Sequence, residues 1–173
     1  MMRINCRWKA LIFVGAVFLL LMTLPVRASP ESFIESMEPY LPIVQQAGLY
    51  PSVFIAQSAL ETGWGKSDAV KYHNYWGIKC RSSPCFSKQT WEIYDGQYWQ
   101  GQLLFQAYPD LATGVQGYCA KINYQREYQD LNRSSRNAFI DTLSKVWATD
   151  PDYAWKLTSI IRVWSLDKYD GRD

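Results

Sequence analysis

The chain has 173 residues, with eighteen basic and sixteen acidic side chains and a formal net charge of +2. Four of the basic residues lie within residues 1–28, which hold no acid, so residues 29–173 carry fourteen basic and sixteen acidic side chains. Without a basic excess, this part is a poor candidate for a nucleic-acid-binding protein. Its length and its lack of repeats or low-complexity tracts indicate one domain with one core, and we expect a monomer.

Residues 1–28 have the pattern of a secretory signal peptide. Arg3, Arg7 and Lys9 precede a mostly apolar run at 10–24, and the small residue Ala28 ends the segment. A positive start, an apolar stretch and a small residue at the cleavage point are the parts of such a leader. The apolar run is shorter than the roughly 20 residues that span a bilayer, so an uncleaved anchor is the weaker alternative. The pattern predicts export to the periplasm or cell wall, with no membrane attachment after cleavage.

Three cysteines remain in the exported part. Cys80 and Cys85 are five residues apart around a turn-forming Ser-Ser-Pro, and an oxidising compartment favours a disulfide between them. Cys119 lies in a helical pattern and is expected to be a free, buried thiol. A zinc site needs further ligands, and the chain has a single His, so we expect no metal and no other cofactor. No pattern supports a catalytic pair of Cys119 and His73.

Helical patterns come first along the exported part. Apolar residues recur at helical spacing in 32–47, although Pro39 and Pro42 should break or kink that helix. A second helix should begin at Pro51 and end at Glu61, because Thr62-Gly63 is a stop signal.

Further helices are expected at 111–124, 137–147 and 151–165, the last with Asp150 as its N-cap and Pro151 in its first turn. Between them, residues 80–107 contain runs rich in Gln, Thr and aromatic residues on both sides of Asp95-Gly96, which is a hairpin signal. The sequence therefore predicts an α+β fold, mainly α, with a helical body and a small β-hairpin lobe.

Aromatic residues are concentrated around the expected hairpin. Those between residues 72 and 108 include Tyr72, Tyr75, Trp76, Trp91, Tyr94, Tyr98, Trp99 and Tyr108. Filling the core of a small lobe is the simpler role for any one ring. A hairpin exposes one face, however, so we expect the group as a whole to provide a surface on which sugar rings stack.

Glu61 follows the uncharged run PSVFIAQSAL and lies near the C-terminal end of the expected helix. The negative pole of the helix dipole and desolvation by Trp64 and other apolar neighbours should both raise the pKa of Glu61. A carboxylic acid that stays protonated near neutral pH can donate its proton to a glycosidic oxygen. Glu61 is therefore a candidate general acid of a glycosidase, with a solvated Glu near a helix end as the simpler alternative.

Four blocks in order carry a resemblance to a known family. They read PSVFIAQSALETGWGKS at 51–67, HNYWGIKC at 73–80, FQAYPDLATGVQGYCAKI at 105–122 and WATDPDYAWKLTSII at 147–161. The chain resembles the bacterial cell-wall endo-β-N-acetylglucosaminidases of glycoside hydrolase family 73, which include flagellar muramidase-type and autolysin domains. The resemblance implies a lysozyme-like fold over residues 29–173 and peptidoglycan glycan strands as the substrate. It also implies Glu61 as the general acid, in a groove between the helical body and the β-lobe.

The resemblance also implies a second carboxylate on the β-lobe. Glu92, in QTWEIYDG, matches the family's acid before the hairpin turn and is the candidate to activate water or to stabilise the cationic transition state. Asp95 is the local rival, although Asp before Gly is a common turn residue. We expect substrate contacts from Trp64, Asn74, Tyr75, Trp76 and Trp147.

Trp147 departs from the family, whose matching block begins with a Tyr close to the catalytic acid. An indole has an N–H donor and no acceptor, so Trp147 either forms a stacking wall for the sugar or the site works differently. Two other classes stay open. A lytic transglycosylase would use Glu61 alone and close an anhydro ring, and a non-catalytic wall-binding module would need neither acid. Whether a hydrolase inverts or retains depends on the carboxylate separation or on help from the substrate.

Overall fold

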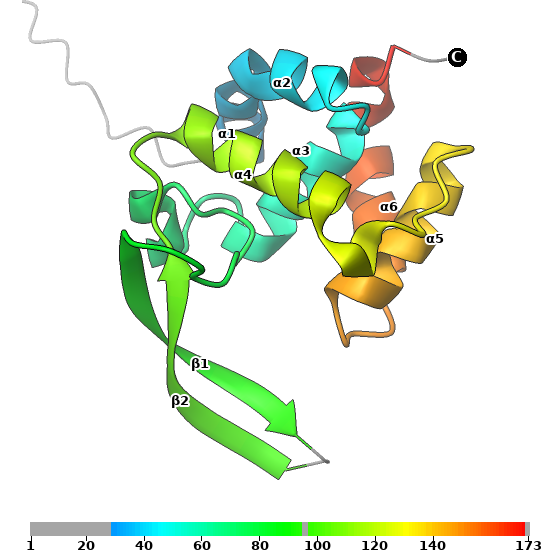
Figure 1. Ribbon diagram of the computed structural model, residues 1–173. Coiled ribbons are helices and arrows are strands. Elements are labelled where there is room, and N and C mark those ends of the chain that lie inside the picture. Colours follow the sequence, from blue (N-terminus) through cyan, green and yellow to red (C-terminus); the bar gives the residue numbers. More distant parts are fainter. Residues whose placement is uncertain (1–28, 95–96, 172–173) are drawn as a thin grey trace, which may run out of the picture.

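The computed structural model describes residues 29–94 and 97–171, and for residues 91–94, 98 and 99 it describes the backbone alone. The predicted signal peptide and the predicted turn residues Asp95 and Gly96 therefore lie outside the described residues. A helical body and a β-hairpin that projects from it make up the described part (Figure 1).

The first helical segment is divided by its prolines, as predicted. Helix α1 (Pro30–Met37) begins after Ser29, whose hydroxyl accepts a hydrogen bond from the backbone N–H of Ser32 at 3.2 Å. A 3₁₀ turn (Glu38–Tyr40) and helix α2 (Leu41–Gln46) follow, each with a proline in its first turn. Proline lacks the N–H that a continuous helix would need at these positions, so the segment bends there.

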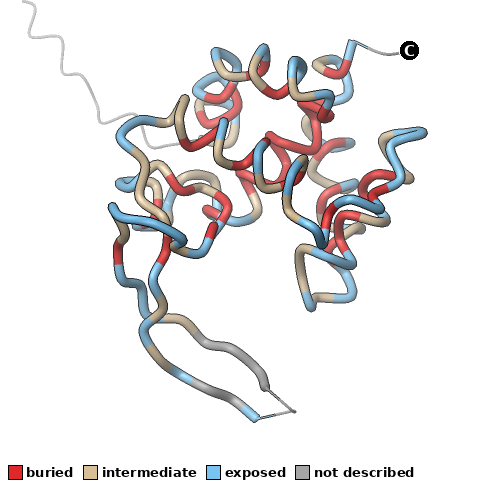
Figure 2. The backbone as a smooth tube through the Cα atoms, viewed as in Figure 1, coloured by how far each residue is buried: buried red, intermediate tan, exposed pale blue. Residues whose placement is uncertain are grey.

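Helix α3 (Pro51–Thr62) is the central element of the body. Residues 51–59 are all buried, which explains why this helix is apolar on every side rather than along one stripe. It ends at Gly63, whose φ of 57° is the left-handed conformation that closes many helices. Helices α1, α2 and α6 contact it, and the buried residues are concentrated in this body (Figure 2).

The later helices begin at polar caps. Helix α4 (Leu111–Tyr124) starts after Asp110, whose carboxylate accepts the N–H of Thr113 at 2.7 Å, and it matches the predicted bounds. Helix α5 (Arg136–Trp147) follows the cap Ser135. Short 3₁₀ turns, Asp68–Tyr72, Arg126–Tyr128 and Leu166–Tyr169, connect or end these elements.

The predicted start of the last helix was wrong by two residues. Helix α6 (Tyr153–Val163) begins after Asp152 instead of after Asp150. The Asp150 carboxylate accepts the backbone N–H of Asp152 at 2.9 Å and forms an ion pair with Lys156. Asp150 therefore closes a turn ahead of the helix, a common local use of an Asp side chain.

The hairpin consists of β1 (Cys85–Tyr94) and β2 (Gln97–Gln106), which pair antiparallel from Cys85 opposite Gln106 to Tyr94 opposite Gln97. This register leaves a two-residue connection, as the Asp-Gly pattern predicts. A second buried cluster, formed by Ala69, Phe86 and Phe105, lies at the base of the hairpin.

The cysteines have the arrangement that the sequence predicts. A disulfide joins Cys80 to Cys85, with Cα atoms 5.8 Å apart, and it ties the loop before the hairpin to the start of β1. Cys119 is free and buried on α4, and burial raises the pKa of its thiol to about 12. None of the helices within residues 29–94 and 97–171 is long and apolar enough to cross a bilayer.

Candidate active site

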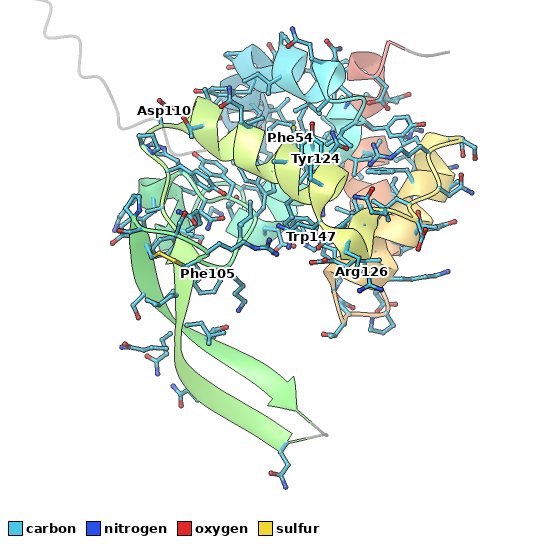
Figure 3. All side chains as sticks on the ribbon, viewed as in Figure 1. Phe54, Phe105, Asp110, Tyr124, Arg126 and Trp147 are labelled. Carbon is cyan, nitrogen blue, oxygen red and sulfur yellow. A yellow bond between two sulfur atoms is a disulfide. The ribbon has the colours of Figure 1, made fainter. Side chains whose placement is uncertain are left out.

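A groove of about 550 Å³ lies between the helical body and the base of the hairpin, in the place that the family resemblance implies. Its lining includes Glu61 from the end of α3, Lys88 from β1, Phe105 from β2 and Trp147 from the end of α5. Phe105 and Trp147 lie on facing sides of the opening between hairpin and body (Figure 3). The groove is partly open to solvent.

The carboxyl group of Glu61 is held by two donors from distant parts of the chain. The indole Nε1–H of Trp147 donates to Glu61 Oε1 at 3.0 Å, and the hydroxyl of Tyr153 donates to the same oxygen at 2.5 Å. Trp147 thus donates a hydrogen bond to the acid and has no acceptor of its own. Because both bonds go to Oε1, the other oxygen, Oε2, can carry a proton into the groove.

Behind Tyr153 lies a buried polar chain that fixes the direction of its hydroxyl. The Nε2 of Gln57 donates to the Tyr153 hydroxyl at 3.2 Å, and the Gln57 Oε1 accepts from the hydroxyl of Tyr118 at 2.6 Å. Gln57 and Tyr118 are 0% and 1% exposed, so neither has water as an alternative partner. Since Gln57 occupies the acceptor side of Tyr153, the tyrosine proton is directed to Glu61.

The surroundings of Glu61 have opposing effects on the pKa of its carboxyl group. Burial against the groove wall raises the pKa of Glu61, and this effect outweighs the hydrogen bonds from Tyr153 and Trp147 and the attraction of Lys88, which lower it. The carboxyl still reaches solvent along the open groove. Burial and the nearby Glu61 raise the pKa of Tyr153, so its hydroxyl remains a donor. The pKa shift has the predicted direction.

The position of the Trp64 ring gives no support to its predicted contact with substrate. Trp64 does not line the groove, and its ring packs edge-on against Phe33 and Trp164, with centroids 5.9 and 5.4 Å away. The reason is local: Gly63 and Trp64 both have left-handed backbone conformations, with φ of 57° and 62°, and the chain reverses there. The groups that contact the acid are Trp147 and Tyr153 instead.

Asn74 and Trp76 line the groove but are almost entirely buried in its wall, and their contact with substrate stays a prediction. Asn74 is fully buried, donates to the carbonyls of Ile78 and Gln106 at 2.8 Å each, and accepts from the N–H of Ile78 at 2.9 Å. Trp76 is 2% exposed, and its Nε1–H donates to the Ser58 hydroxyl at 2.9 Å. Asn74 thus joins its own loop to the end of β2, and Trp76 joins that loop to α3.

Tyr75 and Trp147 are the predicted contact residues that remain available to a ligand. Both are half-buried and line the groove. Tyr75 packs against Phe33 and Trp76, with ring centroids 6.3 and 5.7 Å away, so its ring is held in place in the groove wall. Among the other aromatic residues near the hairpin, Tyr72 stacks on Phe86 at 4.0 Å instead of facing the groove.

Glu92 is placed by its backbone alone, in β1 opposite Trp99 of β2. Its side chain lies outside the described residues, as do Asp95 and the side chains of Trp91, Tyr94, Tyr98 and Trp99. Within the described residues, no group of three His, Cys, Asp or Glu side chains could hold a metal ion.

Several residues of the site were not predicted from the sequence. Tyr153 contacts Glu61 directly, and Gln57 contacts it through Tyr153. The lining of the groove also includes Lys79, Lys88 and Lys156. One signal was present: Gln57 is four residues before Glu61, so both lie on one face of α3, and it is polar within an apolar run. The contact with Tyr153 spans 92 residues and has no local signal.

Comparison with known proteins gives consistent results. The chain is 32% identical over 155 residues to a probable N-acetylmuramidase of Lactococcus lactis, a match that covers 83% of this chain and 35% of the relative. It is also 32% identical over 143 residues to the peptidoglycan hydrolase FlgJ of Vibrio parahaemolyticus, covering 76% of this chain and 46% of that protein. The chain thus spans between a third and a half of the length of these relatives.

The fold is that of solved structures of similar proteins. The catalytic domain of the autolysin Auto from Listeria monocytogenes superposes with a TM-score of 0.73 at 28% identity, covering 82% of this chain and 87% of that one. This likeness confirms the predicted lysozyme-like fold with a helical body and a hairpin. Residues 38–166 match the family Glucosaminidase, described as mannosyl-glycoprotein endo-beta-N-acetylglucosaminidase. The chain therefore belongs to the Glucosaminidase family, glycoside hydrolase family 73.

Proposed function

We propose that this chain hydrolyses the glycan strands of peptidoglycan at N-acetylglucosaminyl bonds, with Glu61 as the general acid. The observation that carries the proposal is the state of the Glu61 carboxyl. It lies in an open groove, burial raises its pKa, and two donors hold one of its oxygens. The names of relatives, including a probable N-acetylmuramidase and a peptidoglycan hydrolase, support the same substrate.

In the proposed reaction, the proton on Glu61 Oε2 passes to the glycosidic oxygen as the bond from that oxygen to the anomeric carbon breaks. The leaving sugar departs as an alcohol, and positive charge develops on the ring that stays bound. Glu61 becomes a carboxylate, and the hydrogen bonds from Trp147 and Tyr153 stabilise the negative charge that forms. The two donors thus lower the pKa of Glu61 in the resting enzyme, against the effect of burial, but they assist the transfer of its proton to the glycosidic oxygen.

Glu92 is proposed as the second carboxylate, which activates the attacking water or stabilises the cationic ring. Side chains two residues apart lie on the same face of a strand, so positions 88, 90 and 92 of β1 share one face. Lys88 and Thr90 on this face both line the groove. The face of β1 that carries position 92 is therefore the face that meets the groove at its base. The family resemblance supplies the rest of the support for this assignment.

Two further parts of the proposal rest on sequence. Export to the periplasm or cell wall rests on the signal-peptide pattern of residues 1–28, and the organisation of residues 29–173 as one monomeric domain rests on length and composition. Tyr75 and Trp147 are the proposed substrate contacts, because they line the groove with rings that a sugar face can cover.

Mass spectrometry of muropeptides released from purified sacculi tests the proposed function. The full exported chain is incubated with sacculi, and the products are reduced with borohydride, which marks the sugar at the new reducing end. Hydrolysis at N-acetylglucosaminyl bonds gives reduced glucosamine ends and the mass of one added water. Reduced muramic acid ends would show cleavage at the alternate bond and overturn the bond assignment. An anhydro product, lighter by one water, would indicate a lytic transglycosylase. Binding without release would indicate a wall-binding module.

A further inference from the structure

Positive side chains gather in a hollow beside the groove, although residues 29–173 carry a net negative charge. Residues 29–173 hold more acidic than basic side chains, yet Lys79, Arg81 and Lys121 line one hollow of about 300 Å³ beside the groove. Lys79 lines both the hollow and the groove, so the two are adjacent. We call this hollow the basic pocket. No acidic side chain lines it among the described residues.

Lys121, on α4, is the most confined of these cations. Its Nζ lies 5.0 Å from the centre of the Tyr128 ring and 5.3 Å from the centre of the Trp147 ring, so two aromatic faces hold the ammonium group in place. Burial lowers the pKa of Lys121, Glu127 opposes that shift, and the like charges of Arg81 and Lys79 add to it. Clustered like charges repel one another, and a bound anion would relieve that repulsion.

The side chain of Trp147 connects Lys121 of the basic pocket to Glu61, the proposed acid. Lys121 lies over the face of Trp147, and the indole N–H of the same residue donates to Glu61. A glycan strand whose cleaved bond lies at Glu61 therefore brings its neighbouring sugars toward the basic pocket. Glucosamine residues of that strand are neutral. Each muramic acid carries a lactyl group that ends either in a free carboxylate or in a stem peptide with carboxylates of its own.

We propose that the basic pocket binds a carboxylate of the muramic acid side groups, and that Arg81 and Lys121 are its main ligands. This inference rests on the proposed function, because it assumes that a peptidoglycan strand occupies the groove. Arg81 can form paired hydrogen bonds with a carboxylate, and Lys121 adds a charge that is already held in position. The pocket then distinguishes a strand that contains muramic acid from a neutral polymer of N-acetylglucosamine, and it fixes which of the two alternating sugars lies over Glu61.

The experiment measures binding of soluble glycan fragments by the Glu61→Gln variant, which lacks the proposed acid and does not consume its ligand. Four fragments are compared. One carries stem peptides, one is freed of them so that lactyl carboxylates are exposed, and the other two are versions of these with their carboxylates converted to amides. Arg81→Gln should weaken binding of the carboxylate-bearing fragments about threefold, the size expected for an exposed ion pair. Lys121→Gln should weaken it about tenfold, as expected for a charged hydrogen bond that is partly shielded from water.

Matched controls separate this site from a general effect of charge. Lys121→Arg keeps the charge and should bind nearly as well as the parent. Arg162→Gln and Lys145→Gln remove exposed cations of α6 and α5 that do not line the pocket, and they should leave binding unchanged. The amidated fragments should bind the parent and the Arg81→Gln variant equally. Arg81 is exposed and does not line the groove that Trp147 lines, so its variant keeps the test valid if Lys121→Gln alters the Trp147 ring.

The outcomes identify the source of the carboxylate or overturn the site. A larger loss with the peptide-free fragment assigns the lactyl carboxylate, and a larger loss with the other assigns the stem peptide. Equal losses on native and amidated fragments, or no loss with either variant, would overturn the basic pocket. Failure of the parent to bind any fragment, together with no release of muropeptides by the wild type, would instead overturn the proposed function.

Discussion

The helical body and the β-hairpin hold their functional residues in different ways. Glu61 is at the end of a helix whose residues 51–59 are all buried, and donors from two other elements fix one of its oxygens. Each strand of the hairpin pairs chiefly with the other strand, and its described side chains contribute Phe86 and Phe105 to a small buried cluster at its base. Elements with few buried contacts open at a lower free energy than a core. The acid is therefore fixed in place by the body, whereas a group on the hairpin depends on how the hairpin meets the substrate.

Glu61→Gln gives the largest expected effect and tests whether the helical body supplies the general acid. The amide keeps the shape of the acid and can still accept hydrogen bonds from Trp147 and Tyr153, but it has no acidic proton to give to the leaving oxygen. General acid catalysis is worth roughly 10²–10⁴ in rate, so kcat should fall by that factor while the glycan still binds. Release of muropeptides measures the rate. Digestion at close to the wild-type rate would show that the acid lies elsewhere.

Glu92→Gln tests the hairpin, with Asp95→Asn as its matched control three residues away. A second carboxylate lies roughly 6.5–9.5 Å from the acid in an inverting glycosidase, so the amide at position 92 should lower kcat by about 10²-fold with little change in glycan affinity. Asp95→Asn should keep most of the activity, because a turn Asp acts through backbone conformation.

Azide sharpens the result for Glu92→Gln. A small anion in the space vacated by the carboxylate should restore activity to an inverting enzyme that has lost its base. Full activity of Glu92→Gln without azide would remove the hairpin from the mechanism, leaving the substrate's acetamido group or a transglycosylase route as the explanation.

Trp147→Phe tests how strongly the body controls the acid. Phenylalanine keeps a ring in the groove wall but removes the N–H that donates to Glu61 Oε1. That hydrogen bond lowers the pKa of Glu61, so its loss should raise the pKa further and move the alkaline limb of the kcat profile to higher pH. Loss of the same bond from the carboxylate that forms should reduce kcat about tenfold.

Trp164→Phe is the control for this change, because Trp164 packs against Trp64 and does not line the groove. Its pH profile should match that of the wild type. An alkaline limb of Trp147→Phe that stays in place, or moves to lower pH, would show that the indole N–H does not act on Glu61.

The sequence predicts the elements better than it predicts their contacts. The bounds of α4, the end of α3 and the two-residue hairpin connection follow from caps, stops and turn residues close by in the chain. Trp147 and Tyr153 reach Glu61 across 86 and 92 residues, and the packing of α6 against α3 and of α5 against α6 brings them there. Trp64 is three residues from Glu61 in the sequence, but its ring packs against Phe33 and Trp164, and the short spacing does not reveal those contacts.

Opening the Cys80–Cys85 disulfide should affect the hairpin and leave the body unchanged. The bond closes a short loop at the start of β1, and by chain entropy such a loop is worth about 2 kcal/mol. In the Cys80→Ser, Cys85→Ser double variant, amide hydrogen exchange should be faster in β1 and β2, while α3 and α4 keep their protection. For the wild-type protein, peptide mapping without reduction should show the peptides of Cys80 and Cys85 linked and Cys119 free. Equal loss of protection in hairpin and body would mean that the two regions open together.

The smallest expected effect concerns stability and again tests the placement of Glu61 in the body. Because burial raises the pKa of Glu61 in the folded protein, its protonated form is favoured there, and the resulting stability is present at low pH. That contribution is lost as pH rises from the unfolded pKa, about 4.3, through the higher folded pKa. Glutamine does not titrate, so the Glu61→Gln variant should gain free energy of unfolding relative to the wild type over this pH range. Urea unfolding from about pH 4 to pH 8 measures the difference, and Glu35→Gln on the exposed side of α1 controls for the loss of one negative charge. The gain should be small because the groove is open to solvent. A difference that is constant with pH would mean that Glu61 is as well solvated in the fold as in the unfolded chain, and the body would then hold the acid no more closely than a hairpin could.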